Sequence, residues 1–103
     1  MKSISVDEAK KLVRDGEVLI LDVRTPMENM QSRIKNSVLI PLNQLESRIN
    51  EILGDKPILV YCRSGNRSLF AAHILERHGF RKVLNLREGI IECPFECIET
   101  DQA

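Results

Sequence analysis

Short, largely apolar stretches alternate along the chain with segments of helical periodicity. Stretches of strand length lie at 18–21, 38–40, 57–62 and 83–86, and Ile4 is expected in a further short strand. Such runs are typical of strands that are covered on both faces, as in a parallel sheet. The alternation of strands with helices predicts an α/β fold with a mainly parallel sheet.

Start and stop signals define the helices between these strands. Ser5 and Glu8 have the spacing of a capping box, and Gly16 is predicted to end the helix that they open. Thr25 is predicted to cap a short helix whose first residue is Pro26. Further helical segments are predicted at 42–53, at 67–78 and from residue 88, and residues 99–103 are expected to fray.

Length and composition describe one globular domain. The 103 residues suffice for one hydrophobic core, so a single domain over residues 1–103 is predicted. Lys and Arg number 15, as do Asp and Glu, which argues against a nucleic-acid or membrane-surface protein. No apolar run approaches the roughly 20 residues of a membrane span, and no secretory signal is expected. Three cysteines are too few for a disulfide scaffold, so a reducing, cytoplasmic compartment is predicted.

One polar segment lies between the clearest predicted strand and the clearest predicted helix: Cys62-Arg63-Ser64-Gly65-Asn66-Arg67-Ser68. A loop that enters a helix at the carboxyl end of a strand directs backbone N–H groups at an anion. Gly65 permits the tight curve, while Arg63 and Arg67 add positive charge. A cysteine at the start of such a loop has a lowered pKa and can act as a nucleophile. We therefore interpret Cys62 as catalytic rather than as a small buried apolar group.

This loop resembles the active-site loop of the rhodanese (sulfurtransferase) family. The likeness extends over nearly the whole chain, through Ile4–Ala9, Leu21–Pro26 with Glu28, Ile40–Pro41, Gly79–Phe80, Val83, Asn85–Leu86 and Gly89. It implies a rhodanese-like α/β fold: a five-stranded, mainly parallel sheet with helices on both faces. The segment after Arg24 departs from the family pattern, because an aromatic residue, Gly-His-Ile and Gly-Ala are replaced by Asn29, Ser32–Ile34 and Asn36–Ser37.

The resemblance also implies a reaction. The Cys62 thiolate accepts a sulfane sulfur from a donor to form a persulfide, and a thiol or cyanide then takes the outer sulfur. Arg63 and Arg67 are expected to orient an anionic donor such as thiosulfate. Ser64 and Ser68 are expected to donate hydrogen bonds, although Ser68 could instead cap the helix. No metal or organic cofactor is needed, and a sulfur-relay protein is a further possible partner.

Two other functions stay open at this point. A rhodanese-like module could bind anions or regulate without turnover, although Cys62 and both arginines argue against it. A small cysteine phosphatase or arsenate reductase is less favoured, because four residues separate Cys62 from Arg67 and such phosphatases carry one more. Those enzymes also need an acid to protonate the leaving oxygen, and none adjoins the loop in sequence.

Two further groups of residues bear on the site. Asp22 is expected to brace the active-site loop and Arg24 to pair with Glu28, in both cases as support rather than chemistry. Cys93 and Cys97 stand four residues apart and could form a redox pair or a resolving thiol for a persulfide. We favour the simpler interpretation, in which they are small apolar residues that fill space. A zinc site is less expected, because it needs four closely paired ligands.

Overall fold

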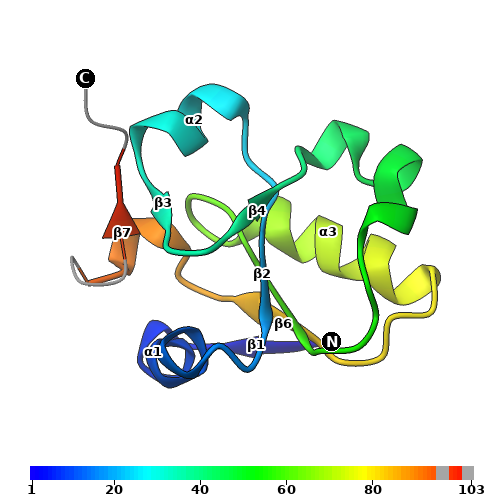
Figure 1. The fold of residues 1–103 in the computed structure, drawn as a ribbon, viewed down its shortest axis with the longest axis horizontal. Helices are drawn as coiled ribbons and strands as arrows, with labels where there is room; N and C mark the ends of the chain where they lie inside the picture. The colour runs from blue at the N-terminus through cyan, green and yellow to red at the C-terminus, as the bar shows by residue number, and fades with distance from the viewer. Residues whose placement is uncertain (95–97, 101–103) are drawn as a thin grey trace.

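A five-stranded parallel sheet forms the centre of the protein. The computed structural model describes residues 1–94 and 98–100. Every pairing in this sheet is parallel among the described residues. The strands lie in the order β1 (Lys2–Ile4), β6 (Val83–Leu86), β5 (Ile58–Tyr61), β2 (Leu19–Asp22) and β4 (Val38–Leu39). Figure 1 labels each of them except β5. The predicted five-stranded, mainly parallel sheet is confirmed.

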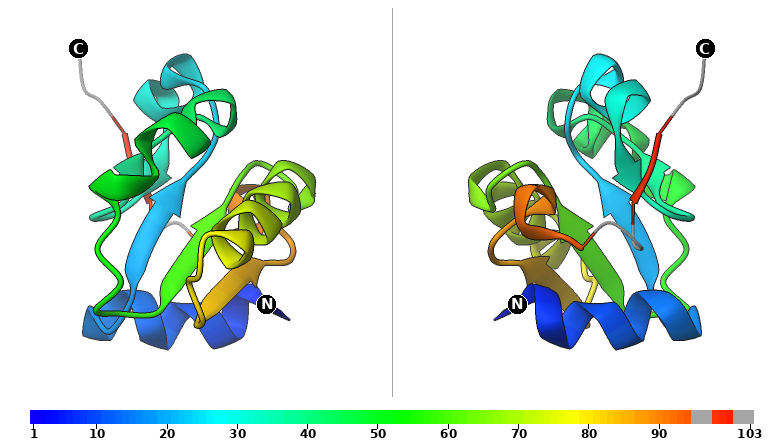
Figure 2. Two further views of the ribbon diagram at one scale, coloured as in Figure 1. Left: turned by 90° about the vertical axis from the view of Figure 1, so that its right-hand side faces the viewer. Right: turned by 90° about the vertical axis from the view of Figure 1, so that its left-hand side faces the viewer.

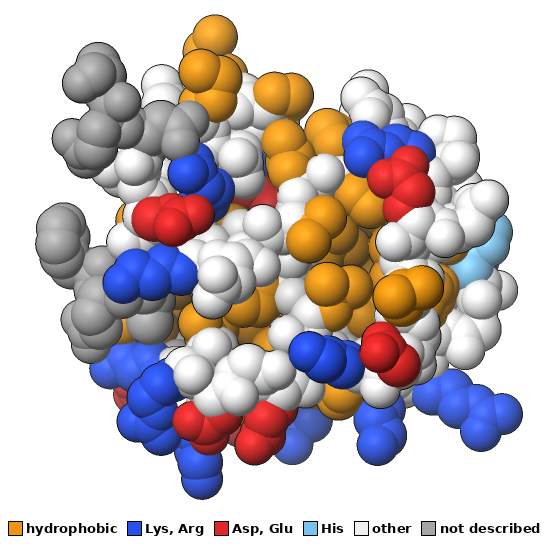
Figure 3. Space-filling model, viewed as in Figure 1, with side chains coloured by type: hydrophobic (Ala, Val, Ile, Leu, Met, Phe, Trp, Pro, Cys, Tyr) orange, Lys and Arg blue, Asp and Glu red, His pale blue; other side chains and the backbone are white. Residues whose placement is uncertain are grey.

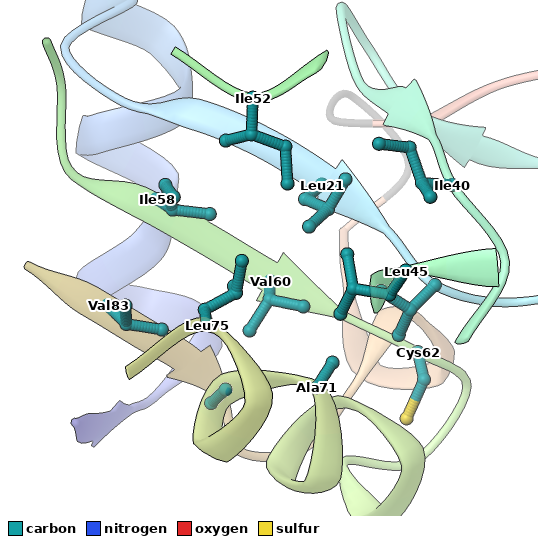
Figure 4. Packing of buried hydrophobic residues seen from close by; sticks show 12 residues of the cluster. Leu21, Ile40, Leu45, Ile52, Ile58, Val60, Cys62, Ala71, Leu75 and Val83 are labelled. Carbon is teal, nitrogen blue, oxygen red and sulfur yellow. The ribbon is translucent and has the colours of Figure 1, made fainter. Parts of the chain in front are cut away.

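Side chains that alternate along the strands build an apolar cluster on each face of the sheet. On one face lie α3 (Asn66–Arg77) and the 3₁₀ helices η1 (Leu42–Gln44) and η2 (Glu46–Glu51). Figure 4 shows Val60 and Cys62 on this face, with Val60 near Leu75 of α3 and Cys62 nearer Ala71. On the other face, Leu59 and Tyr61 pack against α1 (Val6–Asp15) and η3 (Ile90–Glu92). Each buried Leu, Ile or Val contributes roughly 1.5–3 kcal/mol, so the two clusters hold the helices on the sheet.

The first two helices begin at the predicted caps, Ser5 and Thr25. In α1, the Ser5 hydroxyl accepts the Glu8 N–H, the Glu8 carboxylate accepts the Ser5 N–H, and Gly16 ends the helix at φ 67°. Thr25 and Glu28 repeat this exchange at the start of α2 (Pro26–Gln31). Figure 2 shows α2 beyond the arrowheads of the strands. The carboxyl edge of the sheet is therefore where α2 meets the predicted loop.

Two of the local predictions were wrong. The segment predicted as one helix over 42–53 forms η1 and η2, with non-helical dihedral angles at Arg48. Glu99 was expected to fray, but it lies in β7 (Ile98–Glu99), which pairs antiparallel with β3 (Arg33–Ile34). Arg33 reinforces this pairing with an ion pair to Glu99 at 3.0 Å. A contact across 66 positions leaves no periodic signal in either segment.

Charges of both signs lie side by side on the surface. Figure 3 shows Asp and Glu side chains beside Lys and Arg side chains on one face, with apolar side chains exposed between them. The close ion pairs include Arg48–Glu51 at 2.9 Å and Arg67–Glu28 at 2.8 Å. Among the described residues, no helix has the length and apolar character needed to cross a membrane.

Candidate active site

The turn from β5 into α3 forms the floor of the site. β5 ends at Tyr61 and α3 begins at Asn66, so the backbone turns between Cys62 and Gly65. Gly65 has φ 99°, and a Cβ atom there would lie 2.2 Å from the Arg87 carbonyl oxygen. Only glycine fits this position, because both the dihedral angle and the space exclude a side chain. Cys62 lies at the end of the strand and is 1% exposed.

Hydrogen-bond donors converge on the Cys62 sulfur. The Gly65 N–H donates to Sγ over 3.1 Å, and the Ser68 hydroxyl lies 3.4 Å from Sγ. Burial raises the pKa of the Cys62 thiol, but the hydrogen bond between the Ser68 side chain and the sulfur, together with the N–H groups of Ser68, Ser64 and Gly65, outweighs it. The pKa of Cys62 therefore lies below its ordinary value, which favours the nucleophilic thiolate.

A short 3₁₀ helix holds the loop carbonyls away from the sulfur. The N–H groups of Ile90 and Ile91 in η3 donate to the carbonyls of Cys62 and Arg63 over 3.0 and 3.2 Å. Gly89 allows this approach, since a Cβ atom there would lie 2.1 Å from the Arg63 carbonyl oxygen. With the carbonyls of Cys62 and Arg63 bound to η3, the loop presents N–H groups to the Cys62 sulfur. The sequence placed Gly89 only within the family likeness and held no sign of this contact.

The two loop arginines differ in their surroundings. Arg63 is exposed. Arg67 donates from both terminal nitrogens to the carboxylate oxygens of Glu28 over 2.8 Å. The Arg67 hydrogen bonds, helped by those of Thr25, outweigh burial and lower the pKa of Glu28 to about 2. The expected partner of Glu28 was Arg24, and that prediction was wrong: the ion pair instead joins α2 to the first turn of α3.

Arg24 pairs with Asp22 in the interior. Nε and Nη2 of Arg24 donate to the two Asp22 carboxylate oxygens over 2.9 and 2.8 Å. These residues are 3% and 0% exposed. Asp22 also accepts from Asn29 at 3.0 Å and from the Tyr61 hydroxyl at 3.1 Å. These hydrogen bonds hold the segment after β2, and the one from Tyr61 reaches the residue before Cys62. That Asp22 braces the active-site loop stays a prediction.

Tyr61 joins this network to the strand that carries the nucleophile. Its hydroxyl accepts the Ile34 N–H at 3.1 Å and lies 3.0 Å from the Ser37 hydroxyl. Burial, and then the Asp22 charge, raise the pKa of Tyr61 to about 12. The sequence analysis did not predict these contacts. The hydroxyl of Tyr61 could have indicated them, because a tyrosine in a buried strand needs a polar partner.

The remaining predicted site residues lie partly at the rim and partly in the interior. Asn66 is exposed at the first position of α3, and Ser64 is exposed on the loop. Ser68 is buried beneath them, so it faces the sulfur rather than capping the helix. A hollow of about 290 Å³, lined by Glu28, Arg63 and Ile91 among others, lies beside the loop.

The structure describes one of the two cysteines that follow the loop in sequence. Cys93 packs against the apolar cluster beneath α1, as the packing interpretation expects, and Cys97 falls outside the described residues. Within the described part of the chain, no group of three or more His, Cys, Asp and Glu residues is placed to hold a metal ion.

Sequence and fold are both similar to those of known proteins. The family model of the rhodanese-like domain matches residues 5–92. A sulfurtransferase from Allochromatium vinosum is 40% identical over 83 residues, which cover 81% of this chain and 78% of that protein. Thiosulfate sulfurtransferase GlpE from Coxiella burnetii is 33% identical over 88 residues, covering 85% of this chain and 82% of that protein. The crystal structure of a rhodanese-like domain protein from Staphylococcus aureus matches with a TM-score of 0.87 at 30% identity, over 99% of this chain and 100% of that chain.

Proposed function

The chain belongs to the rhodanese-like domain family, and on this premise we propose that it is a sulfurtransferase that carries sulfane sulfur on Cys62. The Cys62 thiolate attacks the outer sulfur of a donor such as thiosulfate. A new S–S bond forms, the S–S bond of thiosulfate breaks, and its electron pair leaves with sulfite. Cyanide or a thiolate then attacks the outer sulfur of the persulfide, and the electron pair of the broken bond returns to Sγ. Two covalent steps of this kind follow ping-pong kinetics.

The observation that carries this proposal is the convergence of donors on one buried sulfur. Backbone N–H groups from Ser64, Gly65 and Ser68 lower the pKa of Cys62 against the opposing effect of burial. The same donors are fixed before any substrate arrives, so they stabilise a developing negative charge without reorganisation. A persulfide is also anionic, and burial of Cys62 shields it from reductants.

The sulfur donor would be a small anion. Arg63 is exposed beside the hollow and supplies positive charge to it. Arg67 presents two N–H groups that suit a sulfonate as well as a carboxylate, but Glu28 now occupies both. An anionic donor that uses Arg67 therefore exchanges with the Glu28 carboxylate. We propose a thiol, cyanide or a sulfur-relay protein as acceptor.

Mass spectrometry tests the persulfide. The intact protein is exposed to thiosulfate, and the peptide that contains Cys62 is expected to gain one sulfur atom, which cyanide then removes. Cys62→Ser is expected to gain none and to transfer sulfur at the rate without enzyme, because no other residue replaces the nucleophile. Cys93→Ser is the matched control, since it removes a partly buried thiol on the other face and is expected to retain most of the activity.

Three outcomes would contradict the proposal. A folded wild-type protein without added sulfur at Cys62 would indicate a module that binds anions without turnover. Equal loss in Cys62→Ser and Cys93→Ser would make a second thiol obligatory. Hydrolysis of an aryl phosphate faster than sulfur transfer would indicate a phosphatase, in spite of the four-residue spacing between Cys62 and Arg67.

A further inference from the structure

Buried polar groups lead from the Cys62 sulfur to the edge strand of the sheet. The Ser68 hydroxyl lies 3.4 Å from Sγ of Cys62 and 2.6 Å from Oδ1 of Asn85. Nδ2 of Asn85 donates to the Ser3 hydroxyl over 3.3 Å, because the register of β1 and β6 sets Ser3 opposite Asn85. Ser68 and Asn85 are 0% and 3% exposed, so bulk water has little access to replace their partners.

A single proton decides how Ser68 acts on the sulfur. Two oxygen atoms 2.6 Å apart need a proton between them, and an amide oxygen has none, so Ser68 donates to Asn85 in this arrangement. The Gly65 carbonyl, 3.1 Å away, is a longer alternative acceptor. The Ser68 oxygen then presents lone pairs to Sγ and accepts the proton of the Cys62 thiol. This direction of the Ser68 hydroxyl fits the thiol form, whereas the thiolate form, which the backbone N–H groups stabilise, needs Ser68 as a donor.

We propose that Asn85 is a positioning residue whose side-chain amide turns end over end when Cys62 changes between thiol and thiolate. This inference rests on the proposed role of Cys62 as the nucleophile. The turned amide places Nδ2 against Ser68 and donates to its oxygen, so the Ser68 proton points at the thiolate. Oδ1 then faces Ser3, whose hydroxyl becomes the donor. The proton that leaves the thiol goes to solvent, and no other covalent bond changes.

The turn keeps every hydrogen bond and reverses its direction. The two ends of an amide have nearly the same shape, so packing around Asn85 is preserved. Ser3 is partly exposed at the edge strand, where solvent can accept or supply the reorganised hydrogen bond.

Charged side chains on the elements around the site form a constant background to this turn. Arg67 on α3 interacts electrostatically with Cys62 and with Asp22 of β2. The others are Arg63 on the loop, Glu28 on α2, and Arg87 and Glu88 after β6. None of them hydrogen-bonds to Ser68 or Asn85 among the contacts of the described residues. Substitutions at Ser68 and Asn85 therefore leave this background in place.

A double-mutant cycle separates an effect through Ser68 from a direct charge effect. Asn85→Asp supplies acceptors only, so it holds the Ser68 proton permanently. On a Cys93→Ser/Cys97→Ser background, it is expected to slow iodoacetamide alkylation of Cys62 near pH 7 by about tenfold and to move the alkylation midpoint to higher pH. In Ser68→Ala, the same substitution is expected to slow alkylation by no more than about threefold, which is the direct charge effect. Equal slowing in both backgrounds would overturn the proposal.

Nuclear magnetic resonance tests the turn in the wild-type side chains, in case Asn85→Asp does not fold. The side-chain amide signals of Asn85 are expected to titrate with the midpoint of Cys62 alkylation, and this titration is expected to disappear in Cys62→Ser and to weaken strongly in Ser68→Ala. Asn85 amide signals that do not change with the ionisation of Cys62, or that titrate in Ser68→Ala as much as in wild type, would overturn the proposal. Both measurements are independent of sulfur transfer, so an inactive protein that shows the coupling would refute the proposed function alone.

Discussion

Two turns at the same edge of the sheet are built in opposite ways. The turn after β5, from Cys62 to Ser68, surrounds a sulfur atom with backbone N–H groups. The segment after β2, from Asp22 to Ser37, is held by side chains that bind one another and the Tyr61 hydroxyl. The N–H groups of the first turn form a backbone cradle that depends on the backbone dihedral angles and on free space around the loop. The network of the second region depends on each of its side chains. The two regions should therefore fail under different substitutions.

The network after β2 should fail when one charge is removed. Asp22→Ala leaves Arg24 buried without its carboxylate and leaves Tyr61 and Asn29 without their shared acceptor. Loss of one member of a buried ion pair typically costs about 3–5 kcal/mol, and we expect the free energy of unfolding to fall by this amount. Urea denaturation followed by circular dichroism measures the change.

An exposed pair of the same geometry gives the matched control. Arg48 donates to both carboxylate oxygens of Glu51 over 2.9 Å, much as Arg24 binds Asp22, but at the surface. Solvent can replace that partner, so Glu51→Ala is expected to change the unfolding free energy far less than Asp22→Ala. Equal effects of the two substitutions would show that burial of the Asp22 network does not govern its contribution.

The backbone cradle should fail when the space around it is filled. Gly89→Ala would place a Cβ atom 2.1 Å from the Arg63 carbonyl oxygen and 2.6 Å from the Ser64 nitrogen, so the loop must shift and its donors must turn away from Cys62. Loss of an aligned donor in such a site costs on the order of 10²-fold in rate. We expect kcat/KM for sulfur transfer from thiosulfate to cyanide to fall by about this factor.

Gly79→Ala separates backbone strain from the contact with the loop. Gly79 also has a positive φ, 91°, but a Cβ atom there meets nothing within 4 Å. It is expected to lower stability by roughly 1–2 kcal/mol and to leave kcat/KM within a few-fold of wild type. Wild-type kcat/KM in folded Gly89→Ala would refute the requirement for close approach of η3 to the loop.

The same contrast explains what the sequence could predict. Caps, strands and the Cys62–Ser68 loop are signalled by neighbouring residues, so the sheet and the position of the candidate nucleophile followed from local pattern and family likeness. Arg24 and Asp22 are two residues apart at a strand end, where side chains point to the same face. That spacing could have predicted their ion pair, whereas Arg24 was expected to pair with Glu28.

Other contacts had no local signal at all. Asn29 and Ser37 lie in the segment that departs from the family pattern, and the structure uses both in the network of Asp22 and Tyr61. The pairing of β3 with β7, like the contact of η3 with the loop, joins segments far apart in the sequence. Such contacts depend on how the whole chain packs, and a single sequence gives no periodicity that reveals them.

The Glu28–Arg67 ion pair joins the two regions, and its removal should have the smallest effect. Glu28→Gln keeps a side chain that can complete the Thr25 capping box but removes the charge, so we expect a loss of no more than about 1 kcal/mol in a partly exposed pair. Arg67 becomes available to an anionic donor, and kcat/KM for thiosulfate is expected to rise by roughly fivefold, equivalent to about 1 kcal/mol. Glu51→Gln, at a distant ion pair, is expected to leave kcat/KM unchanged.

The pH dependence of stability checks the same pair independently of activity. The pKa of Glu28 is about 2 in the folded protein, against an ordinary value of 4.5. A lowered folded-state pKa stabilises the protein above the unfolded-state pKa, and this stabilisation is lost as pH falls toward the folded-state value. The stability difference between wild type and Glu28→Gln should therefore be fully present above about pH 5 and vanish near pH 2. A difference that stays constant over this range would show that Glu28 contributes through packing and capping rather than through its charge on Arg67.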